Sequence, residues 1–282
     1  MKYSQRPKYE RRNETIAVLA MILLCIPVLF IYFSFFANAF ILDSTGELTL
    51  QNFQFLYQPI QLSQYTVEPI GKAFRNTVIF TAIATTLEVT ISCMAGYALA
   101  RMEFTGKRVI SFSLLTLRLF PGVLLLIGVL YVLLHLGILN TLTGVIVVAI
   151  ALRLPGSTFI IRNFFAGIPQ DIENSALVDG CNRLTAFFQV IIHMVKPGLA
   201  SISIFAFMSA WSNYLLFNVL IFNTKTPVLA TYLRVLSRND QMIADYGVFA
   251  AMAMVYMLPV LIFFFISQRQ LMQGTISGGK GI

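Results

Sequence analysis

Long apolar stretches alternate with short polar connections along the whole chain. A helix needs about 20 apolar residues to cross the hydrocarbon core of a bilayer, because lipid offers no partners to free backbone polar groups. The segments that meet this requirement are Ile16 to Ile41, Thr77 to Ala100, Val109 to Leu136, Gly144 to Phe165, Gly198 to Phe222 and Val248 to Ser267. The pattern predicts an all-α integral membrane protein with six transmembrane helices. The fourth is the weakest prediction, since Arg153, Pro155 and Gly156 interrupt it.

The distribution of Lys and Arg predicts the orientation of these helices. Cytoplasmic connections are enriched in both residues. The N-terminal tail carries five of them and the second connection three, whereas the third connection, Gly137 to Thr143, has none. Both termini are therefore expected in the cytoplasm. The predicted organisation is a cytoplasmic tail over residues 1–14, a membrane domain over 15–268 and a second cytoplasmic tail over 269–282.

Composition agrees with a membrane protein and excludes other classes. Hydrophobic residues make up 57% of the chain and charged residues 11%, whereas soluble domains are about 25% charged. The net charge of +8 comes from scattered basic residues, which favours contact with membrane lipid over nucleic acid. The spacing of the three cysteines indicates neither a disulfide framework nor a metal site. The first apolar run is too long for a signal peptide and is expected to be an anchor.

The connection from Pro169 to Pro197 is long enough to have structure of its own. Pro169 suits a first helical turn, where the acids Asp171 and Glu173 match the helix dipole. Gly180 then permits a turn, and Asn182 can cap a second helix. That helix has an apolar face of Leu184, Phe187, Phe188 and Ile191. The pattern predicts two helices joined by a turn at the cytoplasmic membrane surface. These helices could bind a partner protein, or they could only pack against the chain's own helix bundle.

This segment resembles the EAA loop of binding-protein-dependent ABC importer permeases. That loop reads Glu-Ala-Ala, three residues, then Gly, and here it falls on Asn174, Ser175, Ala176 and Gly180, with Asp179 before the Gly. Asn174 replaces the family's Glu. Glu173 is not expected to substitute for it, because adjacent helical positions point about 100° apart.

Further motifs in the same order resemble the carbohydrate branch of this family, in the subunit similar to the shorter permease of the maltose-type systems. They are Gly96 to Arg101 with Phe104, Gly106 and Lys107, then Phe120-Pro121-Gly122, Trp211-Ser212-Asn213-Tyr214 and Gly278-Gly279-Lys280-Gly281. Each motif alone is weak, but their order and spacing together are specific.

The resemblance implies a function and a set of partners. It implies a non-catalytic permease subunit that pairs with a second permease, two ATP-binding subunits and an extracytoplasmic solute-binding protein in a prokaryotic cytoplasmic membrane. The chain itself would bind no cofactor, with ATP and Mg held by the ATPase subunits. The residues implied for coupling to the ATPase are Glu173, Asn174, Ser175, Ala176, Asp179 and Gly180.

Three ionisable residues fall near the middle of predicted spans, where an unpaired charge is costly. They are Glu88, Arg118 and Arg153. One interpretation is a polar translocation path for substrate. The other is structural: an ion pair between Glu88 and Arg118, or hydrogen bonds to carbonyls freed by Pro121 and Pro155. The two interpretations are compatible.

Aromatic and amide side chains in the fifth predicted span offer a second candidate part of the path. Trp211, Asn213 and Tyr214 could stack against and hydrogen-bond a sugar, or anchor the helix at the membrane interface. Near the C-terminus, Gly274 to Gly281 approaches a P-loop but lacks its Ser or Thr. ATP binding by this chain is therefore not expected.

One rival class stays open at this point. A stand-alone secondary transporter or channel could use Glu88 and the two arginines for ion coupling. The sequence has no inverted repeat of interrupted helices that would favour it. An enzyme is not indicated, because no nucleophile, base and orienting group converge.

Overall fold

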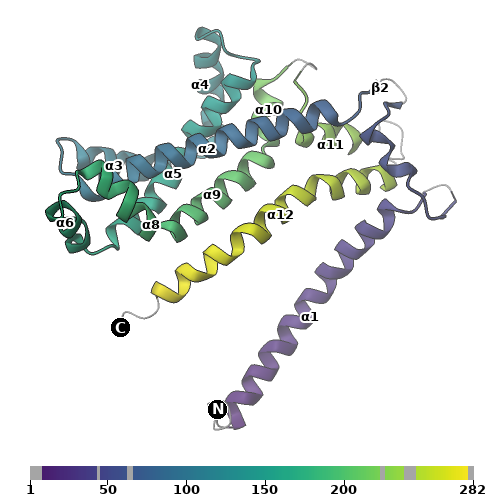
Figure 1. Cartoon of the computed structure of the whole chain (residues 1–282). Helices are drawn as coiled ribbons and strands as arrows, with labels where there is room; N and C mark the ends of the chain where they lie inside the picture. The colour runs from purple at the N-terminus through teal and green to yellow at the C-terminus, as the bar shows by residue number, and fades with distance from the viewer. Residues whose placement is uncertain (1–7, 43–44, 62–65, 223–225, 238–245, 279–282) are drawn as a thin grey trace. The chain divides into compact units, whose positions relative to one another are not determined.

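The computed structural model describes residues 8–42, 45–61, 66–222, 226–237 and 246–278. In this part of the chain nearly all regular structure is helical (Figure 1). The longer helices are α1 (Lys8–Ala39), α2 (Gly71–Arg101), α3 (Lys107–Leu117), α4 (Gly122–His135), α5 (Leu142–Ala166), α9 (Lys196–Trp211) and α12 (Tyr246–Gly278). The shorter ones are η1 (Gln51–Leu56), α6 (Gln170–Val178), α7 (Arg183–Ala186), η2 (Phe187–Ile191), α8 (Ile192–Met194), α10 (Tyr214–Leu220) and α11 (Leu229–Ser237). The two described strands, β1 (Ile60–Gln61) and β2 (Thr66–Val67), pair antiparallel.

Among the described residues, four helices are long and apolar enough to cross a membrane: Ile16–Ala39, Gly71–Arg101, Leu142–Ala166 and Tyr246–Gln268. The number rises to six if each of two bent helix pairs counts as one span. The chain is thus a multi-pass membrane protein made almost entirely of helices. The predicted tails are partly helical, since α1 begins at Lys8 and α12 ends at Gly278.

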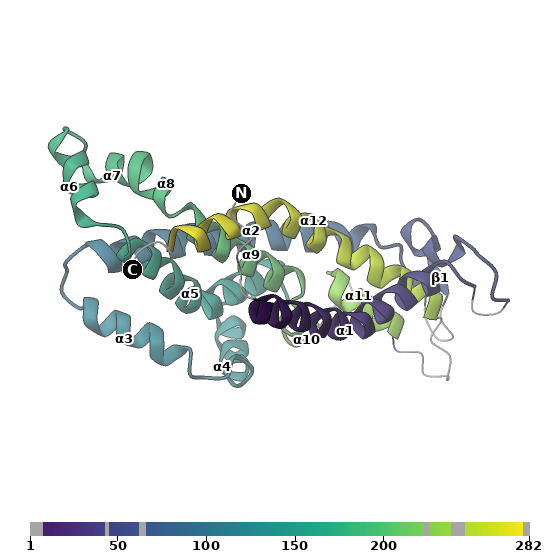
Figure 2. The same cartoon turned by 90° about the horizontal axis from the view of Figure 1, so that it is seen from below.

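The third predicted span, Val109 to Leu136, is not a single helix. It consists of α3 and α4, which meet at 110° (Figure 2). Pro121 stands at the N-cap of α4 in an extended conformation. A proline has no N–H to continue the preceding helix and forces the residue before it out of helical geometry. The predicted third span is therefore two helices with a sharp bend between them rather than a single helix.

The fourth span behaves in the opposite way. It is one continuous helix, α5, that contains Pro155 in its interior. Side chains on the C-terminal side of the proline, among them Ser157, Thr158 and Ile161, are buried. The packing of these residues holds the helix through the proline, so the expected interruption is absent.

The fifth predicted span, Gly198 to Phe222, is divided between α9 and α10. The break falls at Ser212 and Asn213, where Asn213 caps α10 by accepting a hydrogen bond from the backbone N–H of Leu216 at 3.3 Å. At its other end, α9 begins next to Pro197 and makes an angle of 78° with the helix that ends at Met194. The bend separates the membrane helix α9 from the segment before it.

The chain forms two compact units, of which the larger comprises Ile70–Arg234 and Tyr256–Ile282. Its core is built by α2, α5 and α9, which lie side by side (Figure 1). One apolar cluster centres on Phe80 and Phe217, whose rings are 4.8 Å apart. A second contains Tyr97, Phe165 and Phe187 and joins the ends of α2 and α5 to the segment that follows α5.

Close approach of α2 and α5 depends on Gly96. A Cβ at this position would lie 2.5 Å from Cγ2 of Ile161 and 3.1 Å from the backbone N of Arg162. We expect Gly96→Val to separate the two helices and lower the thermal unfolding temperature of the purified chain by on the order of 10 °C, since overpacking costs about 1–3 kcal/mol or more. Gly128→Val in α4, where a Cβ meets nothing within 4 Å, is the matched control. Equal stability of the two variants would contradict this packing argument.

The smaller unit comprises Met1–Pro69 and Val235–Val255. Asn52 of η1 is buried, and its Nδ2 donates to the carbonyls of Ala39 at 3.1 Å and Ile41 at 2.8 Å. These bonds satisfy carbonyls that the C-terminus of α1 leaves open. The contact of Phe35 with Phe249, at 6.4 Å between ring centres, joins α1 to the start of α12.

Candidate functional site

The segment from Pro169 to Pro197, called here the two-helix segment, contains the predicted pair of helices and turn. Gly180 follows α6 with φ +91°, a conformation that favours glycine. The Asn182 side chain then accepts a hydrogen bond from the N–H of Thr185 at 2.8 Å and caps the second helix. That helix runs from Arg183 to Met194 through α7, the π-helical η2 and α8. The segment lies at one end of the larger unit (Figure 2).

Helix α6 has two chemically different faces. Glu173 and Ala176 are buried against the unit, whereas Asn174 and Ser175 are exposed. The exposed face borders a shallow hollow of about 340 Å³, lined by Asp171, Asn174, Ser175, Val178 and Asp179. The argument from helix geometry that Glu173 and Asn174 point in different directions is confirmed. Of the six residues predicted for coupling, Glu173 and Ala176 face inward and the others are exposed.

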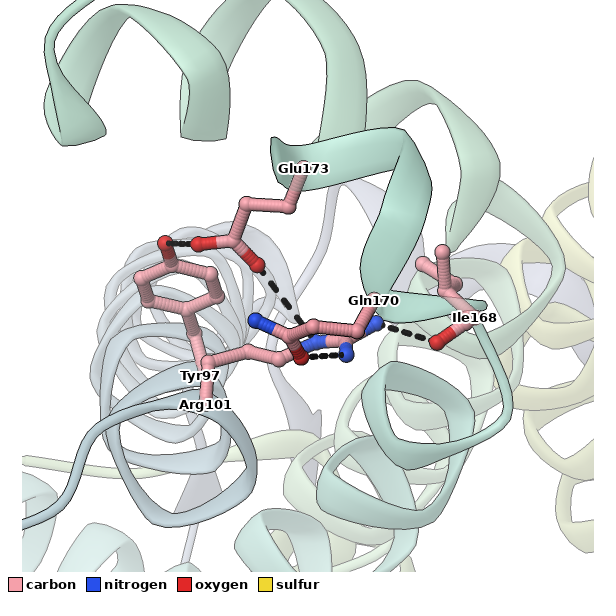
Figure 3. A network of polar contacts seen from close by, with 5 residues as sticks. All are labelled: Tyr97, Arg101, Ile168, Gln170 and Glu173. Atoms are coloured by element: carbon pink, nitrogen blue, oxygen red, sulfur yellow. Dashed lines mark hydrogen bonds and ion pairs between the residues drawn. The ribbon is translucent and has the colours of Figure 1, made fainter. Parts of the chain in front are cut away.

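The inward face of α6 is bound to α2 by a network that we call the α2–α6 clamp: Tyr97, Arg101, Ile168, Gln170 and Glu173. Figure 3 shows Tyr97 and Arg101 reaching from α2 to α6. The Tyr97 hydroxyl donates to Oε1 of Glu173 at 2.7 Å. Arg101 donates from Nη1 to Oε1 of Gln170 at 2.6 Å and from Nη2 to the carbonyl of Ile168 at 2.5 Å. The clamp thus joins the C-terminal end of α2 to the first turn of α6.

The clamp contains an ion pair removed from water. The side chains of Arg101 and Glu173 are 6% and 4% exposed, and Nε lies 3.6 Å from Oε2. Since that distance exceeds a normal hydrogen bond, the attraction between these two atoms is coulombic, and the short hydrogen bonds fix the geometry. Removing one partner of such a pair leaves a buried charge, at a cost of about 3–5 kcal/mol.

The turn at Gly180 depends on backbone conformation rather than on space. A Cβ there meets nothing within 4 Å, so the strain of a side chain would come from the positive φ alone. We expect Gly180→Ala to destabilise the two-helix segment by about 1 kcal/mol and Gly180→Asn by less, because Asn tolerates this conformation. Hydrogen exchange of α6 amides, compared between the two variants, measures the difference. Equal exchange would show that the positive φ is not what the turn requires.

A second polar cluster lies inside the larger unit. Oε2 of Glu88 is 3.1 Å from Nε of Arg153, and Oε1 accepts a hydrogen bond from Ser157 at 2.5 Å. Nη2 of Arg153 donates to the carbonyl of Phe205 at 2.7 Å. The predicted ion pair between Glu88 and Arg118 is therefore not formed, because α5 presents Arg153 and Ser157 to Glu88 instead.

Arg118 is not part of this ion pair, but it lines the same cavity as Glu88 and Arg153. An open cavity of about 350 Å³ is lined by Glu88, Arg118 and Arg153, together with Leu117, Phe120, Gly122, Leu125, Leu152, Gly156, Ser157, Ile160, Phe205 and Ser209. The Arg118 guanidinium is 5.6 Å from the centre of the Phe159 ring. The structure therefore gathers the three predicted mid-span charges around one cavity, which we call the polar cavity. Pro121 caps α4 beside it and is not among its lining residues.

The aromatic candidates lie elsewhere. Trp211 is 3% exposed, and its Nε1 donates to the carbonyl of Tyr256 at 3.0 Å. Asn213 is used as a helix cap. The Tyr214 hydroxyl donates to Asn218 at 2.9 Å, and Arg234 lies 5.1 Å from its ring centre. These three residues serve packing, capping and local hydrogen bonding, and none of them lines the polar cavity.

Sequence reasoning did not assign a role to four members of the clamp: Tyr97, Arg101, Ile168 and Gln170. Arg101 entered only as a cytoplasmic charge and as part of a motif. A usable signal was present, since Tyr97 and Arg101 are four residues apart and so share one helix face at the end of an apolar span. Ser157 and Ser209 of the polar cavity were also missed, because single serines in a membrane helix carry no distinctive pattern.

The described residues do not support a metal site or a P-loop. No group of three or more metal-binding side chains occurs among them. The part of the P-loop-like sequence from Gly274 to Gly278 belongs to α12 and is helical rather than a loop. Residues 279–282, which complete that sequence, lie outside the described part.

A helical membrane unit with a two-faced helix at one end and a polar cavity inside is the arrangement expected of the membrane component of a transporter. Residues 88–276 match the family of binding-protein-dependent transport system inner membrane components. The chain belongs to this family: it is a permease subunit of an ABC importer and not a catalytic subunit.

Relatives and a solved structure agree with this assignment. The chain is 32% identical to the diacetylchitobiose uptake system permease protein NgcG of Streptomyces coelicolor, over 95% of this chain and 87% of that protein. It is 28% identical to the maltodextrin transport system permease protein MdxG of Bacillus subtilis, over 86% and 84%. A bacterial ABC transporter involved in import of the acidic polysaccharide alginate shares the fold, with a TM-score of 0.76, 19% identity and coverage of 94% and 98%.

Proposed function

We propose that this chain is one of two permeases of a saccharide importer in a prokaryotic cytoplasmic membrane. An extracytoplasmic binding protein delivers the solute, and two separate subunits that hold ATP and Mg supply the energy. Curated relatives named for diacetylchitobiose, maltodextrin and trehalose uptake support a saccharide as the solute. Both termini and the two-helix segment lie in the cytoplasm in this proposal, which the Lys and Arg residues of those connections support.

The observation that carries the proposal is the division of α6 into an anchored face and an exposed face. The exposed side chains of Asn174, Ser175 and Val178 form the contact with an ATPase subunit. Val178, at 86% exposed, is an apolar side chain that such a contact would remove from water. The buried side chain of Glu173 holds the helix from behind, through the clamp.

The replacement of the family's Glu by Asn174 changes how this contact is made. Asp171 and Asp179 are exposed on either side of Asn174 and border the same hollow. Their charges supply the negative field that the motif Glu would otherwise provide, so the facing groove of the ATPase subunit is expected to be basic. Asn174 contributes hydrogen bonds, and Val178 contributes apolar contact.

ATP binding would close the two ATPase subunits and move each docked α6. Because α6 is attached to the end of α2 and follows α5 in the chain, its movement tilts the packed α2–α5–α9 core as one body. The path then opens alternately to each side of the membrane. ATP binding and release shift the equilibrium between these two states, and the free energy of ATP hydrolysis drives net transport.

Reconstitution tests the proposal. Liposomes are prepared with the purified chain alone, and with the chain, its second permease, the ATPase subunits and the binding protein. We expect saccharide uptake only with all components and ATP. Uptake by the chain alone, driven by an ion gradient, would support the rival secondary transporter and overturn the assignment of partners.

A further inference from the structure

The polar cavity carries a net positive charge. Glu88 and Arg153 neutralise each other across 3.1 Å, and the remaining bonds of Glu88 and Arg153 go to Ser157 and to the carbonyl of Phe205. Arg118 makes no ion pair with any residue that the structure describes. Of the three charges on the cavity wall, one cation therefore lacks a counter-ion.

The position of Arg118 keeps it available to a solute. It is the C-cap of α3, immediately before the bend to α4, and its side chain is exposed. Its contact with the ring of Phe159, at 5.6 Å, orients the guanidinium without neutralising it. A cation at this depth is costly unless it faces water or an anion. An anionic solute would supply the missing negative charge and so would explain why an unpaired Arg118 lines the cavity.

We propose that the polar cavity binds the anionic group of an acidic saccharide, a carboxylate, sulfonate or phosphate ester, with Arg118 as its principal ligand. This inference rests on the saccharide function proposed above and narrows it. A guanidinium offers two parallel N–H donors to such oxyanions. Ser209 adds a hydroxyl to the wall, and Phe120, Leu125 and Leu152 provide apolar surface for the sugar ring. The volume of about 350 Å³ lies within the range of small-molecule sites.

Gly156 supplies a sharp way to test the role of this charge. A Cβ at Gly156 would lie 3.9 Å from Nε of Arg118 and in contact with no closer side chain. Gly156→Asp therefore places a carboxylate beside Arg118 and neutralises the cavity from within, while Gly156→Asn has nearly the same shape and no charge. This pair changes the charge of the site without removing Arg118.

The experiment uses the complete reconstituted transporter and two matched probes: a neutral disaccharide and the same disaccharide with one primary alcohol oxidised to a carboxylate. Uptake of each is measured for the unchanged chain, Arg118→Gln, Arg118→Lys, Gly156→Asp and Gly156→Asn. Since the binding protein is the same throughout, its own preference cancels when the anionic-to-neutral ratio is compared between variants. We expect this ratio to fall about tenfold or more in Arg118→Gln and Gly156→Asp, and to stay within about threefold in Gly156→Asn. Arg118→Lys should give an intermediate ratio, because Lys keeps the positive charge but lacks the two parallel N–H donors.

Other outcomes overturn the inference. If the anionic-to-neutral uptake ratio is unchanged in Arg118→Gln and Gly156→Asp, Arg118 does not bind the anionic group of the solute. Loss of the second permease from purified Arg118→Gln complexes would show that Arg118 pairs with an acid of that subunit instead. If neither saccharide is taken up by the unchanged complex while another solute class is, the saccharide function fails and this inference fails with it.

Discussion

Replacing Arg101 by Met is expected to uncouple ATP hydrolysis from transport. The substitution keeps a long side chain but removes the hydrogen bonds to Gln170 and Ile168 and leaves Glu173 buried without its cation. The substitution should weaken the attachment of α6 to α2 by about 3–5 kcal/mol of free energy. We expect uptake by the complete transporter to fall at least tenfold while basal ATP hydrolysis persists and no longer responds to the loaded binding protein.

The comparison of uptake with hydrolysis separates this role from general destabilisation. A chain that merely misfolds would lose both activities together. Relief of the buried charge provides a second check: Arg101→Met combined with Glu173→Gln should recover stability relative to Arg101→Met alone, although not coupling. Tyr97→Phe removes only the hydrogen bond to Glu173, so it should reduce coupled uptake less than Arg101→Met or the double variant does.

An exposed ion pair close by is the matched control. Lys107 and Glu103 form a salt bridge of 2.8 Å just beyond α2, with the Glu103 side chain 89% exposed. Exposed pairs of this kind contribute little. Glu103→Gln should therefore transport normally. Coupled transport at normal rates by Arg101→Met would show that α6 moves the membrane helices without the clamp.

The two prolines show what the sequence could and could not predict. Hydropathy located four of the six predicted spans on single long helices, but Pro121 and Pro155 had to be judged without knowledge of their neighbours. Around Pro121 the side chains of Leu119, Phe120 and Val123 are exposed, so no packing opposes a bend. Behind Pro155, tight packing against α2 keeps the helix continuous. The same residue type thus has opposite effects, and tertiary contacts decide between them.

The candidate site divides in the same way. Periodicity along a single helix was enough to predict that Glu173 and Asn174 point to different sides, and capping rules were enough to predict the turn at Gly180. The partners of Glu88 and Glu173 depend instead on how α2 rotates against α5 and α6. That rotation is set by contacts such as Gly96 against Ile161, which no local pattern reveals. The predicted partner of Glu88 was Arg118, and only the placement of α5 against α2 shows that Arg153 takes that position instead.

Glu88→Gln is expected to cause the largest loss of stability among substitutions in the polar cavity. The amide can still accept a hydrogen bond from Ser157, but Arg153 loses its counter-ion inside a membrane span. A cost of about 3–5 kcal/mol should lower the thermal unfolding temperature of the purified chain by on the order of 10 °C. Glu47→Gln, at an exposed position, is the control and should unfold normally.

The double variant Glu88→Gln with Arg153→Gln decides whether the loss comes from the ion pair. If the unpaired Arg153 is what destabilises the single variant, removing its charge as well should restore much of the unfolding temperature, because a buried pair contributes less than the cost of breaking it. The Phe205 carbonyl can still accept a hydrogen bond from the new amide. Strictly additive losses in the double variant would mean that Glu88 and Arg153 act independently and that the 3.1 Å contact does not stabilise the helix bundle.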